Sequence, residues 1–220
     1  MVGVNSGTGN ILARKLGIPH NLDAAAKLIT ADHGRKKIDG MKIKDRVFIL
    51  NVSAGISSLT MRDTRTEEKR RFGIIAYFWT GMLRWLGFKP PYFTLSLDGR
   101  DERVRASEIF VANASPPMVP SLPSGIDVRL DDGELDVFVV RARTVPDYVK
   151  LVWNVFFARQ SPDSELRFRT VRREIRIASD PALPVQADGE AIGYTPVEIA
   201  ILPAAVEMIV PSNKSLDSTG

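Results

Sequence analysis

The acidic residue Glu190 directly follows a turn motif that would fix the position of its backbone. Asp188-Gly189 is typical of a tight hairpin turn, because glycine adopts the positive φ that such turns need, and Glu190 follows at once. Strand-like runs at 174–178 and 197–202 flank the stretch. A carboxylate at the end of a rigid strand is held in place and can accept a proton from a hydroxyl. The same residues also fit a surface hairpin with a solvated glutamate, so both interpretations stay open on chemistry alone.

A second candidate, Gly7-Thr8-Gly9-Asn10, lies between strand-like residues 1–6 and a short helix. Leu12 and Leu16 lie at helical spacing, and Gly17 is a plausible end of this helix. Free N–H groups at a glycine turn before a helix favour an anion such as a phosphate. A capped turn without a ligand is the alternative. The motif is not a P-loop, because the Gly-Lys-Ser/Thr ending is missing.

The composition is that of a globular protein with room for a sizeable core. The 220 residues are 44% hydrophobic and 25% charged. The absence of cysteine excludes disulfides, thiolate catalysis and cysteine-based zinc sites, and two histidines, His20 and His33, are too few for a histidine-rich metal site. A net charge of +4 fits a surface that meets anionic lipid or nucleotide without requiring either. No run reaches the roughly 18 apolar residues of a membrane span.

The periodicity predicts a mainly β protein, of class α+β, built as an antiparallel β-sandwich or barrel-like domain. A buried or lipid-facing helix is also predicted over 72–87, apolar nearly all round; it fits either the core or one wall of a lipid-accepting groove. The other elements expected are strands over 46–53, 92–97, 104–113, 167–177 and 205–210, a hairpin over 126–140 turning at Asp132-Gly133, and helices over 11–16, 21–29 and 146–157.

Taken in order, these motifs resemble the diacylglycerol kinase and sphingosine kinase-like family, and within it the bacterial YegS-like lipid kinases. The resemblance covers nearly the whole chain. It is carried by residues 7–19, by 48–55 (a strand ending in Asn-x-x-x-Gly), by 111–113 with 130–136, by 185–190, and more loosely by 203–211. Each motif alone is weak, and together they are specific.

The resemblance implies roles for particular residues around a nucleotide. Glu190 resembles the general base that takes the proton of a lipid hydroxyl as it attacks the γ-phosphate of ATP. Thr8, together with its neighbours Gly7, Gly9 and Asn10, resembles a contact to the nucleotide phosphates. Asp39 resembles an acidic residue of the network around those phosphates.

The resemblance also implies a magnesium ion that holds the sandwich beside the active site. Asp132 resembles its ligand, with the backbone carbonyls of Arg129 and Glu134 completing the set. Oxygen-only ligands suit Mg²⁺. Phosphoryl transfer needs such a metal, donors around the phosphates and a base aligned on the hydroxyl.

Two departures from the family pattern bear on what we expect. The family's Gly-Gly-Asp-Gly-Thr nucleotide loop lies well upstream of the Gly7 motif, and only six residues precede Gly7 here. We therefore expect a C-terminal portion: a remnant of the α/β nucleotide-binding domain at 1–40, the sandwich at 41–211 and a flexible tail at 212–220. Ile11 stands where many relatives carry Asp, and Ser115-Pro116-Pro117 replaces a glycine pair, so the lipid itself is not determined.

The function implied is an ATP-dependent lipid kinase, cytoplasmic and peripheral at the inner membrane face, present as a fragment with little activity of its own. The alternative is a non-catalytic lipid- or partner-binding β-sandwich derived from that family. Nucleic acid is not an expected partner, because the arginines between 167 and 176 are not interleaved with stacking aromatics other than Phe168. A homodimer stays open.

Overall fold

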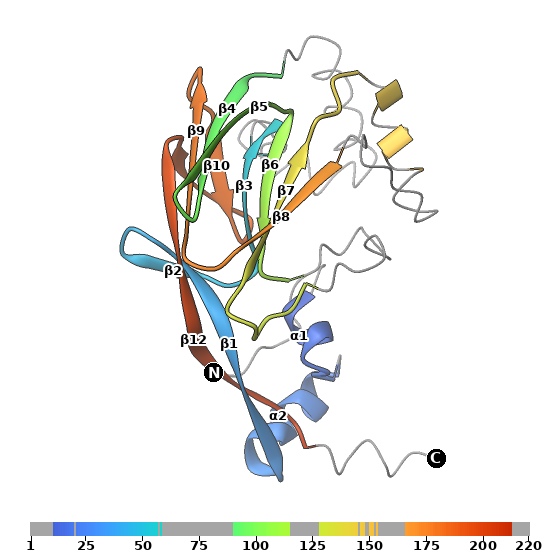
Figure 1. The fold of residues 1–220 in the computed structure, drawn as a ribbon. Coiled ribbons are helices and arrows are strands. Elements are labelled where there is room, and N and C mark those ends of the chain that lie inside the picture. The colour runs from blue at the N-terminus through green and yellow to red at the C-terminus, as the bar shows by residue number, and fades with distance from the viewer. Residues whose placement is uncertain are drawn as a thin grey trace.

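Two six-stranded antiparallel sheets pack face to face (Figure 1), which confirms the predicted sandwich and fold class. The computed structural model describes residues 11–19, 21–56, 58, 90–114, 128–144, 146–147, 150–151, 153 and 166–212. The first sheet has the order β2-β1-β12-β9-β4-β5 and the second β11-β10-β3-β6-β7-β8. Among these residues, no helix is both long enough and apolar enough to cross a membrane.

The helices are α1 (Ile11–Lys15) and α2 (Leu22–Thr30). The strands are β1 (His33–Ile43), β2 (Arg46–Phe48), β3 (Asn51–Gly55), β4 (Tyr92–Leu97), β5 (Arg100–Arg105), β6 (Glu108–Ala112), β7 (Leu135–Val140), β8 (Leu166–Val171), β9 (Glu174–Asp180), β10 (Pro184–Ala187), β11 (Glu190–Tyr194) and β12 (Val197–Pro211). The predicted helix over 72–87, the Gly7–Asn10 motif, Ser115–Pro117 and residues 213–220 lie outside the described residues.

The main core lies between the sheets, where alternate residues of each strand point inward. In β4, Phe93 and Leu95 are fully buried, while Tyr92 on the other face is half exposed. Leu95 pairs in register with Ile177 of β9, which is also fully buried. Burying one such side chain contributes about 1.5–3 kcal/mol, so this interior dominates the stability of the sandwich.

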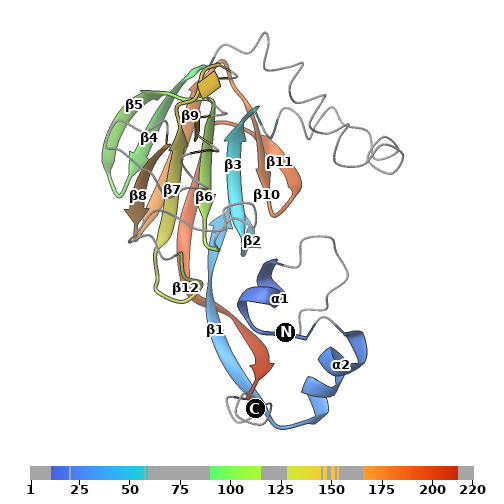
Figure 2. The ribbon, with the colours of Figure 1, turned by 90° about the vertical axis from the view of Figure 1, so that its right-hand side faces the viewer.

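Strands β1 and β12 extend beyond the sandwich toward α1 and α2 (Figures 1 and 2). A second, separate apolar cluster forms there, and it includes Leu16 of α1, Ala25 of α2, Ile38 of β1 and Met208 of β12. The strand β1 therefore crosses the predicted domain boundary at residue 40 and joins the two clusters covalently.

Three predicted strands are wrong as single elements, because the chain passes from one sheet to the other within each. The run 46–53 divides into β2 in the first sheet and β3 in the second, with Ile49 and Leu50 between them. The run 104–113 divides between β5 and β6 in the same manner, at Ala106-Ser107. The run 167–177 divides between β8 of the second sheet and β9 of the first, at Arg172-Arg173. A continuous β-branched and aromatic pattern indicates strand conformation, but it cannot show where a strand changes its partners.

The predicted hairpin over 126–140 is also wrong. Only Leu135–Val140 is a strand, and it pairs with β6 and β8 rather than folding back on residues before Asp132. The described part of the preceding segment, 128–134, is a loop held by contacts with Asp39 of β1, which accepts from the Gly133 N–H and donates its own N–H to Leu130 O. Of the helix predicted over 146–157, the described residues Pro146, Asp147, Lys150, Leu151 and Trp153 are helical.

Two Asp-Gly hairpins anchor the outer strands of the two sheets in the same way. In both turns the Asp and Gly have positive φ: 50° and 81° at Asp98-Gly99, and 48° and 87° at Asp188-Gly189, as a type I′ turn requires. Each Asp carboxylate accepts three consecutive backbone N–H groups. Asp98 takes those of 172–174 at 2.8–3.1 Å, and Asp188 those of 49–51 at 2.8–3.0 Å.

We expect Asp98→Asn to lower the melting temperature at neutral pH. Burial on its own raises the pKa of Asp98, but the N–H groups of Arg172, Glu174 and Arg173 outweigh it and lower the pKa below 3.8. A depressed carboxyl pKa adds stability above the unfolded-state pKa, and that stability is lost as pH falls through the folded-state pKa. Thermal unfolding of both proteins from pH 7 to pH 2 should show the difference shrinking below pH 4; a constant difference would contradict the assignment.

Candidate functional site

Glu190 opens β11 directly after the Asp188-Gly189 turn, as the sequence predicted, and its carboxylate faces solvent. Its side chain is 64% exposed. The nearest charged partner is Arg46 of β2, whose Nη2 lies 2.5 Å from Glu190 Oε2. These two residues are 144 positions apart in the sequence and belong to different sheets, so only the packing of the two sheets brings them together.

The backbone beneath Glu190 is fixed by Asp188. Besides the three N–H groups that its carboxylate accepts, the Asp188 N–H donates to Asn51 O at 3.0 Å. The turn is therefore attached to the segment 49–51, where the chain passes between sheets. A carboxylate two residues from such an attachment has a defined backbone position, which general base catalysis requires.

Asn113 is a residue to which the sequence assigned no role, although it ends the motif at 111–113. It is fully buried, and its Nδ2 donates to both Asp39 O at 2.9 Å and Ile49 O at 2.8 Å. Its own N–H donates to Leu50 O. Since Nδ2 must donate twice, Oδ1 is an acceptor, and it has no hydrogen-bond partner among the described residues. An asparagine directly after a buried strand was the only signal in the sequence.

Asp39 is buried and binds backbone rather than solvent. Its Oδ2 accepts the Gly133 N–H at 2.7 Å and its Oδ1 the Ala204 N–H at 2.8 Å. It sits at a bulge where the β1–β12 pairing shifts register between Ile38 and Gly40. Asp39 thus joins three segments, and its described contacts place it in the frame of the molecule. Its predicted role in a phosphate network stays a prediction.

The loop 128–134 concentrates the predicted metal-binding residues. Burial raises the pKa of Asp132, and the negative charges of Glu134 and Asp39 raise it further, although the Glu134 N–H, 3.1 Å from Asp132 Oδ1, partly offsets them. The neighbouring acids are paired: Asp131 with Lys36 at 3.1 Å, and Glu134 with Arg172 at 2.5 Å.

A raised carboxyl pKa next to other carboxylates is the electrostatic setting that a bound cation reverses. In the described part of the chain, no group of three or more His, Asp or Glu side chains is arranged to hold a metal. The predicted site differs from such a cluster, since it uses one carboxylate, Asp132, and the backbone oxygens of Arg129 and Glu134. This oxygen donor set suits the chemistry of Mg²⁺.

The structure links most of the predicted residues through one chain of contacts. Asp39 bonds to the loop of Asp132, and Asn113 connects Asp39 to Ile49, whose N–H is held by Asp188. Glu190 lies at the far end of this chain. The Gly7–Asn10 motif lies outside the described residues, but α1 begins at the next residue. Leu16, directly after α1, belongs to the apolar cluster against which Leu12 of α1, Ile49 and Leu50 also pack, so α1 and the segment that Asp188 holds share one cluster.

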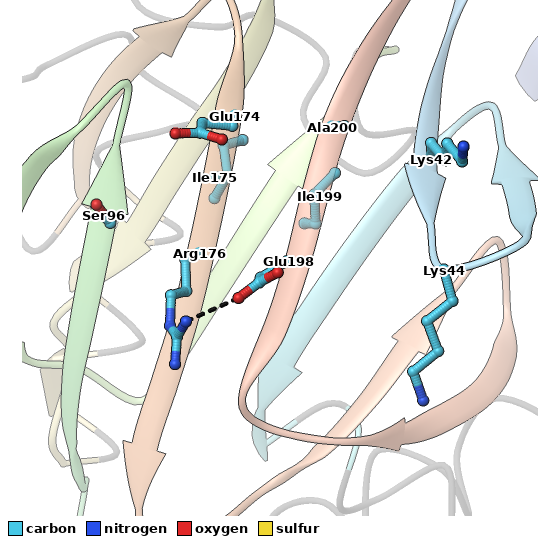
Figure 3. A pocket seen from close by; sticks show the side chains of 9 residues that line it. All are labelled: Lys42, Lys44, Ser96, Glu174, Ile175, Arg176, Glu198, Ile199 and Ala200. Carbon is cyan, nitrogen blue, oxygen red and sulfur yellow. Dashed lines mark hydrogen bonds and ion pairs between the residues drawn. The ribbon is translucent and has the colours of Figure 1, made fainter.

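A depression of about 500 Å³ lies elsewhere, on the outer face of the first sheet (Figure 3). The lining residues are Lys42, Lys44, Ser96, Glu174, Ile175, Arg176, Glu198, Ile199 and Ala200. Across it, Arg176 and Glu198 form an ion pair at 2.7 Å (Figure 3). No residue of the Glu190 network lines this depression, so we place the candidate site at Glu190.

Comparison with known proteins identifies relatives over most of the chain. The family model of the YegS C-terminal NAD kinase beta sandwich-like domain matches residues 50–210. A Staphylococcus aureus protein named "putative lipid kinase" is 24% identical over 208 residues, 92% of this chain and 66% of that protein. An uncharacterized Synechocystis protein is 26% identical over 212 residues, 95% of this chain and 49% of that protein.

Among solved structures, a "putative diacylglycerol kinase" from Bacillus anthracis superposes with a TM-score of 0.72 at 26% identity. The match covers 93% of this chain and 66% of that one. The chain therefore spans about half to two thirds of the length of the relatives it matches.

We expect Asp39→Asn to destabilise the protein by about 1–3 kcal/mol, because the amide nitrogen would face a backbone N–H and leave a buried donor without an acceptor. Urea unfolding should show the change as a lower midpoint. Asp101→Asn, at an exposed position on β5, serves as the control and should leave the midpoint unchanged. Equal midpoints for wild type and Asp39→Asn would contradict a structural role for this carboxylate.

Proposed function

The chain belongs to the family of the YegS C-terminal NAD kinase beta sandwich-like domain, and on that basis we propose that it acts as a lipid kinase, transferring the γ-phosphate of ATP to a lipid hydroxyl. The names of its relatives support kinase chemistry on a lipid. The observation that carries the proposal within this chain is Glu190. Its carboxylate is exposed, while the turn before it is attached to the segment 49–51 by four hydrogen bonds through Asp188.

In the proposed reaction, the Glu190 carboxylate accepts the proton of the lipid hydroxyl as that oxygen bonds to the γ-phosphorus. The bond between the γ-phosphorus and the bridging oxygen to the β-phosphate breaks, and ADP leaves with the electron pair. The products are a phosphomonoester lipid and ADP. The protonated Glu190 side chain then returns its proton to solvent. Because phosphoryl transfer depends mainly on positioning and charge, a rigidly held carboxylate is what this chain can contribute.

An aromatic row on the second sheet supports a lipid as the acceptor. Phe110, Phe138 and Phe168 are cross-strand neighbours on β6, β7 and β8, with ring centroids 6.4 and 5.4 Å apart. They belong to a small apolar cluster, with Ala112, Val128 and Leu166, that is separate from the core between the sheets. Phe110 and Phe168 remain partly exposed, so they offer apolar surface to an acyl chain. A protein peripheral to a membrane fits this arrangement.

The same aromatic row favours a second function, a lipid-binding sandwich that performs no chemistry. The two proposals differ in what they require of Glu190. A binding module needs the apolar surface alone, whereas a kinase needs the carboxylate as well.

We also propose that Mg²⁺ binds at Asp132 with the backbone oxygens of Arg129 and Glu134. Burial, together with the negative charges of Glu134 and Asp39, raises the pKa of Asp132, and an ion bound there would offset this cost of ionising the carboxyl. Its role would be to hold the loop 128–134 in place beside Asp39.

For this site we expect Mg²⁺ at 100 times its dissociation constant to stabilise the wild-type protein by about 2.7 kcal/mol and to leave Asp132→Asn unaffected. Without Mg²⁺ at pH 7, Asp132→Asn should be at least as stable as wild type, because a raised folded-state pKa makes the ionised carboxylate a cost that appears as pH rises through that pKa. Thermal unfolding with and without Mg²⁺ tests both, with Asp101→Asn as control. An equal response of Asp132→Asn to Mg²⁺ would rule out this ligand.

For the kinase itself, we expect Glu190→Gln to lower kcat by roughly 10²–10⁴-fold, the usual contribution of a general base, with little change in ATP binding. The assay follows transfer of label from radiolabelled ATP to mixed lipid vesicles. It uses the 220-residue chain and a form extended through the sequence encoded in frame upstream of Met1. Glu198→Gln is a matched control, since Glu198 is also exposed and paired with an arginine but lies on the outer face of the first sheet.

Full activity in Glu190→Gln would overturn the base assignment. If both forms are inert on diacylglycerol, sphingosine and related lipids but still bind the vesicles, the kinase proposal fails and the binding module replaces it.

A further inference from the structure

A guanidinium group lies directly on the carboxylate proposed as the base. Arg46 belongs to β2, an edge strand of the first sheet, and Glu190 to β11, an edge strand of the second. Their ion pair joins the two sheets along one side of the sandwich. Figure 2 shows β2 and the β10–β11 hairpin at the end of the sandwich that faces α1.

The pair is too exposed to matter for folding. The Arg46 side chain is 56% exposed and that of Glu190 64%. Exposed ion pairs contribute about 0–1 kcal/mol, since water and salt screen them. Little free energy therefore opposes an exchange of partners, and a ligand with more negative charge than one carboxylate can displace Glu190 from Arg46.

Arg46 has a second contact that keeps it in place when the pair opens. Its Cζ lies 4.8 Å from the ring centroid of Phe48, two residues on along β2. Phe48 is itself buried in the main core. A cation over an aromatic face is attracted to it, so the guanidinium stays beside Glu190 whether or not the two are bonded.

We propose that Arg46 is a phosphate-binding residue of this site. Its guanidinium leaves the Glu190 carboxylate and binds the terminal phosphate of the nucleotide instead. The inference rests on the proposed function. A phosphate offers the planar guanidinium fork two acceptor oxygens and a higher charge than one carboxylate, so it is the stronger partner. The exchange leaves Glu190 next to the phosphate with its oxygens free to accept the hydroxyl proton. Arg46 thereby couples arrival of the nucleotide to release of the base.

The test compares Arg46→Ala with Arg176→Ala in the vesicle assay described for Glu190. Arg176 is a matched control, because its side chain is 55% exposed and pairs with Glu198 at 2.7 Å on the outer face of the first sheet. We expect Arg46→Ala to lower kcat/KM for ATP by about 10- to 100-fold, through loss of charge-assisted hydrogen bonds. The kcat/KM of Arg46→Lys for ATP should lie between those of wild type and Arg46→Ala, since an ammonium group keeps the charge but lacks the two-pronged geometry of a guanidinium. Arg176→Ala should stay within about twofold of wild type.

The direction of the change separates the alternatives. A faster Arg46→Ala variant would show that the arginine only blocks the base, and a variant equal to Arg176→Ala would show an ordinary surface ion pair. Either result overturns the proposal.

Equilibrium binding of ATP separates this inference from the proposed function. Weaker ATP binding in Arg46→Ala than in Arg176→Ala supports phosphate contact even where Glu190→Gln proves fully active or no lipid is labelled. Equal ATP binding by the two variants, measured in the longer form, overturns the assignment of Arg46 whatever the turnover.

Discussion

The Asp188 carboxylate accepts the N–H groups of Ile49, Leu50 and Asn51 where the chain leaves the first sheet and enters the second. Ile49 and Leu50 lie between strands, where no neighbouring strand supplies an acceptor for their N–H groups, and a buried N–H group without an acceptor is costly. The Asp188 carboxylate accepts both of these N–H groups and that of Asn51. The remaining features of the site follow from this contact, because it fixes the crossing and the turn that carries Glu190 with a single side chain.

The sandwich repeats this solution with Asp98, whose carboxylate holds residues 172–174 between β8 and β9. The two hairpins differ in what comes next: Arg100 follows the first turn and Glu190 the second. The Asp-Gly turn is therefore structural in both places, and the proposed chemistry concerns only the second, where the residue after the turn is a carboxylate that faces an arginine. Asp39 applies the same principle at a third place, the bulge that links β1, β12 and the loop 128–134.

The site thus combines a stiff backbone with an exchangeable side-chain contact. Hydrogen bonds to Asp188 and Asn113 restrain the segment 49–51 from two sides, and Asn113 is fully buried. The Arg46–Glu190 pair above it is exposed and weak. A catalytic base needs this division, because its position must be constant while its bonding partner changes during a reaction cycle.

The sequence by itself determined the features that depend on a few neighbouring residues. The Asp188-Gly189 turn followed from the φ that glycine permits, the end of α1 from Gly17, and the fold class from many short strands at regular spacing. Glu190, Asp39 and Asp132 became candidate residues through the family resemblance. Only the tertiary structure decided that the runs 46–53, 104–113 and 167–177 each contribute strands to two sheets. It also decided that Asp188 and Asp98 hold distant backbone, and that Asn113 links Asp39 to Ile49. The physical reason is that turn and strand preferences act within a few residues, whereas a carboxylate finds a partner 137 to 144 positions away only after the sheets have packed.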